Sequence, residues 1–117
     1  EAARLIEASP DFRLLRRVPG PRDWPLSTSR GETRRGVFVD TETTGLDLDT
    51  DEVIELALLP FEYERESGAI VSVDYDAALC AFRQPSFPIS PESSKIHGIT
   101  DEMVAGQIID PDRIRSL

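Results

Sequence analysis

The stretch that decides the fold is Val37-Phe38-Val39-Asp40-Thr41-Glu42-Thr43-Thr44-Gly45-Leu46. Its first three residues are β-branched or aromatic and follow a glycine, which predicts a short buried strand over 37–39. Side chains two apart in a strand share a face, so we expect Asp40 and Glu42 to project together from its end. Two neighbouring carboxylates repel each other and lose hydration, and a divalent cation is the usual compensation. Because carboxylate oxygens suit Mg²⁺ or Mn²⁺, the pair predicts a metal site.

The same pattern has an ordinary alternative, because an isolated Asp-x-Glu pair is common and most such acids are solvated surface residues. Two further features of this sequence favour the metal site over solvated surface acids. A polar turn follows at Thr43, Thr44 and Gly45, and glycine lets a backbone approach a ligand closely. A second apolar run begins at Val53, so the two acids stand between two predicted strands.

The stretch 37–46 resembles the first motif of the DEDD-type, DnaQ-like 3′–5′ exonucleases, the family of the bacterial DNA polymerase III epsilon proofreading subunit and of ribonuclease T. The segment Ile96-His97-Gly98-Ile99-Thr100-Asp101-Glu102-Met103 resembles the H-G-I-x-D-E segment that follows the third strand in that family. The two motifs stand in the family's order and at about its spacing. The resemblance covers residues 36 to about 117 and does not reach the first 35.

This resemblance implies an α/β, ribonuclease H-like fold, of which the chain would hold an incomplete N-terminal part: a three-stranded antiparallel meander followed by helices. It also implies a metal-dependent 3′–5′ exonuclease that hydrolyses the terminal phosphodiester of a nucleic acid, with two Mg²⁺ or Mn²⁺ ions in the complete site. Asp40 and Glu42 match the family's first two acids, so they are the expected catalytic and metal-binding residues. The residues that match nucleotide-contacting positions are Thr43, Thr44, Gly45, Leu46, Glu92 and His97.

His97 is the only histidine, and a catalytic base is a tempting role for it. In the family that base stands in a later motif, so we expect His97 to contact the nucleotide or, alternatively, to have a structural role at a helix end. The family's third and fourth acids stand in later segments of the H-N-A-x-F-D and H-x-A-x-x-D type, and neither occurs here. We therefore expect these 117 residues to be a truncated enzyme, inactive or nearly so when alone.

Composition bounds the class of protein. A chain of 117 residues is one domain at most, and 39% apolar residues allow a modest core. The single cysteine, Cys80, excludes an internal disulfide and fits a reducing cytosol, so we expect a cytoplasmic location. The sequence has neither an apolar run long enough to span a bilayer nor a signal-peptide pattern, so we expect no membrane partner.

The net charge of −9 is divided unevenly. Residues 1–35 carry eight arginines and five acids, which is +3, whereas residues 36–117 carry five basic residues and seventeen acids, which is −12. Phosphate binding normally uses lysine and arginine, so the acidic part argues against a metal-free nucleic-acid binder. It is compatible with phosphodiester chemistry if metal ions supply the positive charge.

Residues 1–35 are expected to form an N-terminal helical segment and a basic linker, and residues 36–117 the exonuclease part. Helix-forming residues occupy 2–8, and Ser9-Pro10-Asp11 predicts the start of a second helix. The apolar side of that helix would consist of Phe12, Leu14, Leu15 and Val18.

Four arginines of this segment form either a phosphate-contacting patch or, the favoured interpretation, a solvated face: Arg13, Arg16, Arg17 and Arg22. Residues 19–35 are expected to be a linker or surface loop, with Trp24 packed back on the domain.

A second strand is predicted over 53–64, where Pro60 marks a bulge or an unpaired edge because proline lacks an amide donor. Glu55 within it is expected to be a hydrogen-bonded structural acid. A third strand lies within 70–83, interrupted near 74–77, and short connections make the three strands antiparallel.

Helices are predicted to begin at Pro91, after Thr100 and at Pro111, and the first of them ends at Gly98. The acidic loop 47–51 lacks the glycine and the glutamate that an EF-hand needs, so it is predicted to be a solvated turn.

Two functional interpretations stay open. The favoured one is the N-terminal part of an exonuclease that acts on a free 3′ end, of DNA rather than RNA; proofreading, repair and RNA trimming, and a polymerase partner, stay undecided. The alternative is a non-catalytic interaction module that keeps half of the fold and works with a second chain. A partner, or a homodimer that exchanges elements, would cover the sheet face that the predicted helices leave bare.

Overall fold

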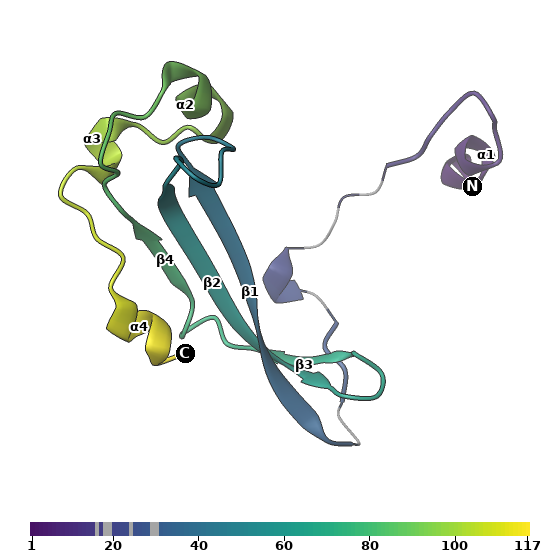
Figure 1. Ribbon diagram of the computed structural model, residues 1–117. Coiled ribbons are helices and arrows are strands. Elements are labelled where there is room, and N and C mark those ends of the chain that lie inside the picture. Colours follow the sequence, from purple (N-terminus) through teal and green to yellow (C-terminus); the bar gives the residue numbers. More distant parts are fainter. Residues whose placement is uncertain (16, 18–19, 24, 29–30) are drawn as a thin grey trace.

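The computed structural model describes residues 1–15, 17, 20–23, 25–28 and 31–117. Figure 1 shows a twisted antiparallel sheet with helices at one end of it. The elements in chain order are α1 (Ala2–Glu7), the 3₁₀ helix η1 (Pro21–Asp23), β1 (Thr33–Thr43), β2 (Val53–Glu64), β3 (Ile70–Val73), β4 (Leu79–Phe82), α2 (Pro91–His97), α3 (Asp101–Val104) and α4 (Pro111–Arg115). No described helix has the length and apolar character that crossing a membrane requires.

Strand β2 is the centre of the sheet. One edge of it pairs antiparallel with the whole of β1, from Thr33↔Glu64 to Thr43↔Val53. Its other edge pairs first with β4 and then with β3, both antiparallel. The two short strands are the halves of the predicted third strand, divided at 74–78, so the α/β fold with an antiparallel meander followed by helices is confirmed.

Pro60 lies at the point where the outer edge of β2 changes partner. Pairing with β4 ends at Leu58, and pairing with β3 begins at Phe61. The carbonyl of Pro60 accepts a hydrogen bond from the Asp74 amide at 2.9 Å, so its ring nitrogen faces the same edge. The missing donor therefore falls in the gap between two partners, as the unpaired-edge prediction requires. The alternative, a bulge near Pro60, corresponds to the register shift two residues further on, between Glu62 and Tyr63.

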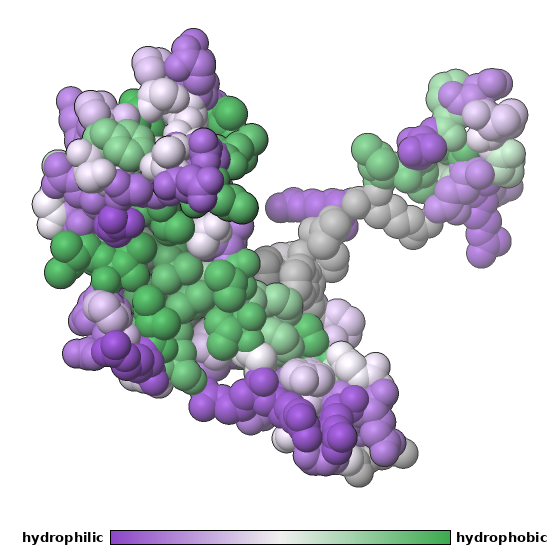
Figure 2. Space-filling view, viewed as in Figure 1, coloured by the Kyte–Doolittle hydropathy of each residue, from purple (hydrophilic) through white to green (hydrophobic). Residues whose placement is uncertain are grey.

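Val37, Phe38 and Val39 form a strand as predicted, but the prediction that this strand is buried is wrong. Their side chains are 42%, 44% and 63% exposed. The outer edge of β1 pairs with no strand in the described part of the chain, and these three side chains, which alternate between the two faces of the strand, are only partly covered. Figure 2 shows apolar side chains gathered on one face of the sheet.

The Phe38 ring stacks on Phe61, with centroids 4.2 Å apart. Gly36 makes room for this stack, since a Cβ there would lie 2.5 Å from the Phe61 ring.

The core lies at the end of the sheet under α2 and α3. Ile54 of β2 packs with Ile89, Ile99 and Val104, which are at most 6% exposed, and Phe82 packs against the cluster. Helix α2 begins where predicted, because the Ser90 hydroxyl accepts the Ser93 amide at 3.1 Å and Pro91 follows. It ends at Gly98, whose φ of +78° is readily adopted only by glycine. Local capping therefore delivers the two apolar segments that cover Ile54.

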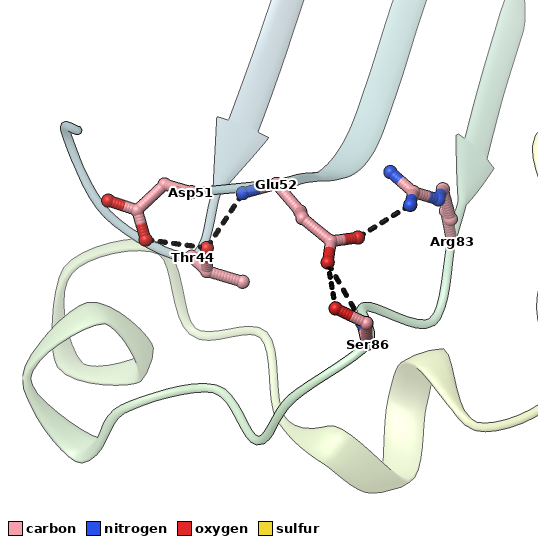
Figure 3. A network of polar contacts seen from close by, with 5 residues as sticks. All are labelled: Thr44, Asp51, Glu52, Arg83 and Ser86. Carbon is pink, nitrogen blue, oxygen red and sulfur yellow. Dashed lines mark hydrogen bonds and ion pairs between the residues drawn. The ribbon is translucent and has the colours of Figure 1, made fainter. Parts of the chain in front are cut away.

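A polar network ties the start of β2 to the segment after β4 (Figure 3). One carboxylate oxygen of Glu52 accepts hydrogen bonds from the amide of Ser86, at 3.2 Å, and from its hydroxyl. The other oxygen pairs with the Arg83 guanidinium at 2.5 Å. The hydrogen bonds from Ser86, assisted by the charge of Arg83, lower the pKa of Glu52. Glu52 thus bridges two parts of the chain that are more than thirty residues apart.

The N-terminal segment departs from its prediction. Helix α1 agrees with the helix expected over 2–8, and the Asp11 amide donates to the Ser9 hydroxyl at 3.3 Å. No helix follows that turn in residues 12–15 and 17, where Phe12 is 69% and Leu15 is 85% exposed. A short helix needs a packed apolar side to be stable, and here nothing described covers it.

Strand β1 begins at Thr33, so the expected linker over 19–35 is too long by three residues. The Arg22 guanidinium lies 4.8 Å from the centroid of the Tyr75 ring, so this arginine is not simply solvated. The expectations for Arg16, Val18 and Trp24 fall outside the described residues.

The Glu52 network predicts a pH-dependent stability. A carboxyl whose pKa is lowered from 4.5 by folding stabilises the native state above that pH, and the stabilisation is lost as the pH falls through the lowered pKa. We expect Glu52→Gln to destabilise the chain in denaturant titrations at pH 7 and to have a smaller effect near pH 3. Glu66→Gln, at an exposed turn acid, is the control and should change little at either pH. An equal effect of Glu52→Gln at both pH values would contradict the prediction.

Burial also predicts contrasting costs for two truncations. Ile54 is fully buried, so Ile54→Ala should lower the free energy of unfolding by about 2–5 kcal/mol. Val39 is 63% exposed, so Val39→Ala should cost less than about 1 kcal/mol. Urea denaturation followed by circular dichroism measures both. A Val39→Ala cost as large as that of Ile54→Ala would mean that β1 is covered in solution.

Candidate active site

The two acids of the first motif lie on one face of β1. In the register with β2, Asp40 is opposite Ala57 and Glu42 is opposite Glu55. Residues two apart in a strand share a face, so the carboxylates project to the same side. Asp40 is exposed and Glu42 is half-buried. A bulge between Glu42 and Thr43 ends the regular pairing directly after them.

Glu55 adds a third carboxylate to this face. Its Oε1 accepts a hydrogen bond from the Cys80 thiol at 3.1 Å, which agrees with the prediction of a hydrogen-bonded structural acid. That bond, together with burial and the negative charge of Glu55, raises the pKa of the Cys80 thiol. The thiol therefore stays protonated and remains a donor to Glu55, and one oxygen of this acid is already engaged.

The donor chemistry suits a hard divalent cation, because Asp40 and Glu42 offer carboxylate oxygens. Over residues 1–15, 17, 20–23, 25–28 and 31–117, no group of three or more His, Cys, Asp or Glu side chains could hold an ion together. The described residues thus supply a pair of ligands rather than a closed site.

Thr44 is the buried centre of the turn that follows β1, with 5% of its surface exposed. Its hydroxyl donates to Asp51 at 2.8 Å and accepts the Glu52 amide at 2.9 Å (Figure 3). Its carbonyl accepts the Ser93 hydroxyl of α2 at 2.6 Å. Its amide also donates to the Glu52 carbonyl at 2.9 Å, so the hydroxyl, the amide and the carbonyl of Thr44 are all engaged in the fold.

Thr43 and Gly45 in the same turn are half-buried, whereas Leu46 is exposed. The Thr43 hydroxyl donates to the Gly45 carbonyl at 2.5 Å, which tightens the turn. The Leu46 side chain is 98% exposed and Leu48 is 99% exposed. Both border a hollow of about 470 Å³ that Thr43 and Gly45 also line. An apolar side chain held out in solvent is available to contact a flat apolar surface such as a base.

Helix α2 brings the remaining predicted residues near this turn through the bond from Ser93 to Thr44. Glu92 is exposed in the first turn of the helix, and His97 is its last residue. The Nδ1 atom of His97 accepts the Ile99 amide at 3.0 Å, so the ring hydrogen belongs on Nε2. That Nε2 is buried without a hydrogen-bond partner among the described residues. His97 thus has the helix-end role that was the alternative prediction, and it keeps one donor unused.

Sequence reasoning missed the residues that hold the turn. Asp51 was expected to be a solvated loop acid, but both of its carboxylate oxygens accept hydrogen bonds, from Thr44 and from the Asp47 amide. That expectation is wrong because the turn folds back on the carboxylate. Ser93 lies inside the predicted helix that begins at Pro91, and its bond to Thr44 joins residues 49 positions apart. The available signal was the position of Asp51 at the end of a glycine-containing turn, where short polar side chains often accept backbone amides.

Comparison with known proteins agrees with the two motifs. The RNase_T family model, described as "Exonuclease", matches residues 37–108. The protein named "Uncharacterized exonuclease CP81", from Escherichia phage 186, is 38% identical over 68 residues, which are 58% of this chain and 28% of that protein. A "DNA polymerase III PolC-type" from Pediococcus pentosaceus is 34% identical over 76 residues, which are 65% of this chain and 5% of the polymerase.

The chain therefore spans less than a third of the length of both curated relatives. Exonucleases of this family act on nucleic acid and generally use divalent metal ions. The family match covers more than half of the chain and includes the acid pair, the turn and the histidine segment. The chain belongs to the RNase_T family of exonucleases.

Proposed function

We propose that the chain is the N-terminal part of a 3′–5′ exonuclease domain that removes nucleotides from the 3′ end of a nucleic acid by a two-metal mechanism. One observation carries the proposal. Asp40 and Glu42 share a face of β1, and the turn that follows them is bonded to the helix that holds Glu92 and His97. Acids that suit a cation and groups that suit a nucleotide are thereby brought to one end of the sheet.

In this proposal Asp40 and Glu42 hold divalent ions, Mg²⁺ or Mn²⁺, which when bound supply an attacking hydroxide and stabilise charge on the phosphate. The chain's own contribution is to place the terminal nucleotide. The exposed Leu46 side chain lies under its base, and the backbone of Thr43–Gly45 lines its sugar and phosphate. Glu92, which is exposed, and His97, which is half-buried at the end of α2, are its polar contacts.

The proposed substrate is DNA with a free 3′ end, in preference to RNA. Similarity to a PolC-type DNA polymerase III supports this choice and makes a polymerase a plausible partner. In this proposal residues 36–117 are the exonuclease part and carry only the first acidic motif of the domain. Residues 1–35 are a separate basic segment. Because ligand count governs the affinity for a cation, two carboxylates alone should hold ions weakly, and the chain alone should be nearly inactive.

A second candidate function is an interaction module that works with a partner chain or as a homodimer. The exposed β1 face favours it. An apolar hollow of about 400 Å³, bordered by Phe38, Leu59 and Cys80, opens beside Asp40. An uncovered apolar surface next to an unpaired strand edge is a common site of association. Sedimentation separates the two functions, since a well-folded monomer would count against the need for a partner.

The metal site is tested by titrating the isotope-labelled chain with Mn²⁺ and following paramagnetic broadening by NMR. Amide signals of residues 39–46 should broaden first, with weak affinity because the site offers few ligands. Asp40→Asn and Glu42→Gln should each weaken binding about tenfold, since each removes one of two charged ligands. Asp76→Asn, at an exposed acid elsewhere, is the matched control and should have no effect. Equal broadening in all four proteins would refute the site.

Activity is tested with single-stranded DNA labelled at its 3′ end, in the presence of Mg²⁺ or Mn²⁺. We expect the chain alone to release almost no mononucleotide, because two carboxylates do not complete the ion site. Metal-dependent release that disappears in Asp40→Ala would show that the described acids suffice, and would refute the proposed dependence on further acids.

A further inference from the structure

The turn between β1 and β2 closes around one carboxylate. Both oxygens of Asp51 are engaged: Oδ1 accepts the Thr44 hydroxyl and Oδ2 accepts the Asp47 amide, each at 2.8 Å. The amide of Asp51 in turn donates to the Asp47 carbonyl at 2.8 Å. Asp51 therefore holds the first and the fourth residue of the segment 44–47 at once.

The same carboxylate explains the glycine of the motif. Gly45 does not have a positive φ, so its backbone conformation alone does not require glycine. A Cβ at this position would lie 2.4 Å from Oδ2 and 2.7 Å from Oδ1 of Asp51, which is closer than real contacts allow. The missing side chain thus makes room for Asp51, and residue 45 lies directly against the carboxylate.

Asp51 is itself held in a rigid frame. Thr44, which donates its hydroxyl hydrogen to Asp51, makes two hydrogen bonds with the backbone of Glu52. The Thr44 amide donates to the Glu52 carbonyl at 2.9 Å, and the Thr44 hydroxyl accepts the Glu52 amide at 2.9 Å. The Glu52 carboxylate is bonded to Ser86 and Arg83, and Ser93 reaches the Thr44 carbonyl (Figure 3 shows the part of this network around Glu52). The turn is therefore fixed to β2, to the segment after β4 and to α2.

We propose that Asp51 is the positioning residue of the nucleotide-contacting turn. It fixes residues 44–47, and with them the exposed Leu46, relative to Asp40 and Glu42. It does so through the hydrogen bonds that both of its oxygens accept from the turn. This inference rests on the proposed function, in which the turn contacts the terminal nucleotide.

The test measures two ligands on the full chain: Mn²⁺ alone, and deoxythymidine 5′-monophosphate in the presence of Mn²⁺, both by NMR titration. Asp51→Asn keeps the size of the side chain but turns an amide NH₂ toward a hydrogen-bond donor. We expect it to weaken nucleotide binding about tenfold, the loss of roughly one good hydrogen bond, and to leave Mn²⁺ affinity within about twofold of the original. A residue that only stabilised the fold would not separate these two affinities.

The matched control is Asp49→Asn, which removes the same charge from the same loop. The Asp49 side chain is exposed, and the variant should bind both ligands like the original chain. If Asp51→Asn does not fold, Thr44→Val decides instead, because valine removes the hydroxyl that donates to Asp51. Thr44→Val should then lose nucleotide affinity about tenfold and keep Mn²⁺ affinity within about twofold, with Asp49→Asn as the unchanged control.

The outcomes separate the inference from the function on which it rests. If the original chain binds both ligands and Asp51→Asn, or Thr44→Val in its place, binds the nucleotide equally well, the positioning role is overturned and the proposed function stands. Equal losses of both affinities would also overturn it, in favour of a general structural role. If the original chain binds neither ligand, the proposed function itself fails, and the inference fails with it.

Discussion

The register between β1 and β2 is the constraint on which the rest of the structure depends. The pairing is continuous from Thr33↔Glu64 to Glu42↔Glu55, and a shift of one residue would exchange the two faces of β1. That register places Asp40 and Glu42 on the side where the Cys80 thiol meets Glu55. The bulge after Glu42 then releases the chain from the ladder and turns it into the segment that carries Leu46. The acids are therefore positioned by the backbone hydrogen bonds of the ladder, and the turn begins where this ladder ends.

Hydrogen bonds of Thr44 and Glu52 hold the turn that follows the paired strands. Thr44 is nearly buried, and its hydroxyl, amide and carbonyl all have partners from other segments. Every polar group of this residue is therefore hydrogen-bonded although it is buried. The Arg83–Glu52 pair is partly exposed, and such pairs contribute little by themselves. Their value here is geometric, because the bonds to Glu52 and Thr44 join the strand ends to α2.

The outer edge of β1, which pairs with none of the described strands, and its exposed apolar residues contrast with this end of the sheet. An eleven-residue strand with open hydrogen-bonding groups invites association, and native proteins usually cover or pair such an edge. Residues 36–117 carry a net charge of −12. Their carboxylates need positive charge nearby before they can approach phosphate. The first surface would suit an apolar partner. The second surface, which is anionic, would suit cations.

Local signals in the sequence were sufficient for much of the fold. An apolar run from Val53 predicted β2, Pro60 predicted a bulge or an unpaired point on its edge, and Ser90-Pro91 with Gly98 predicted both ends of α2. These features depend on neighbouring residues alone, through backbone geometry and capping bonds. The acid pair of the candidate site was likewise readable, because side chains two apart in any strand share a face.

What only the tertiary structure decided concerns contacts between distant segments. The exposure of Val37–Val39 depends on which elements cover β1. The described residues 12–15 and 17 form no helix, because a short helix there would need its apolar side to be packed. The role of Asp51 emerged only when the turn folded back on its carboxylate, beneath a glycine whose missing side chain leaves the space. The sequence by itself determined the strands, the helix ends and the alternation that aligns the two acids, since these are local properties. Burial and hydrogen-bond partners were decided by the assembled chain, because they depend on residues far apart along it.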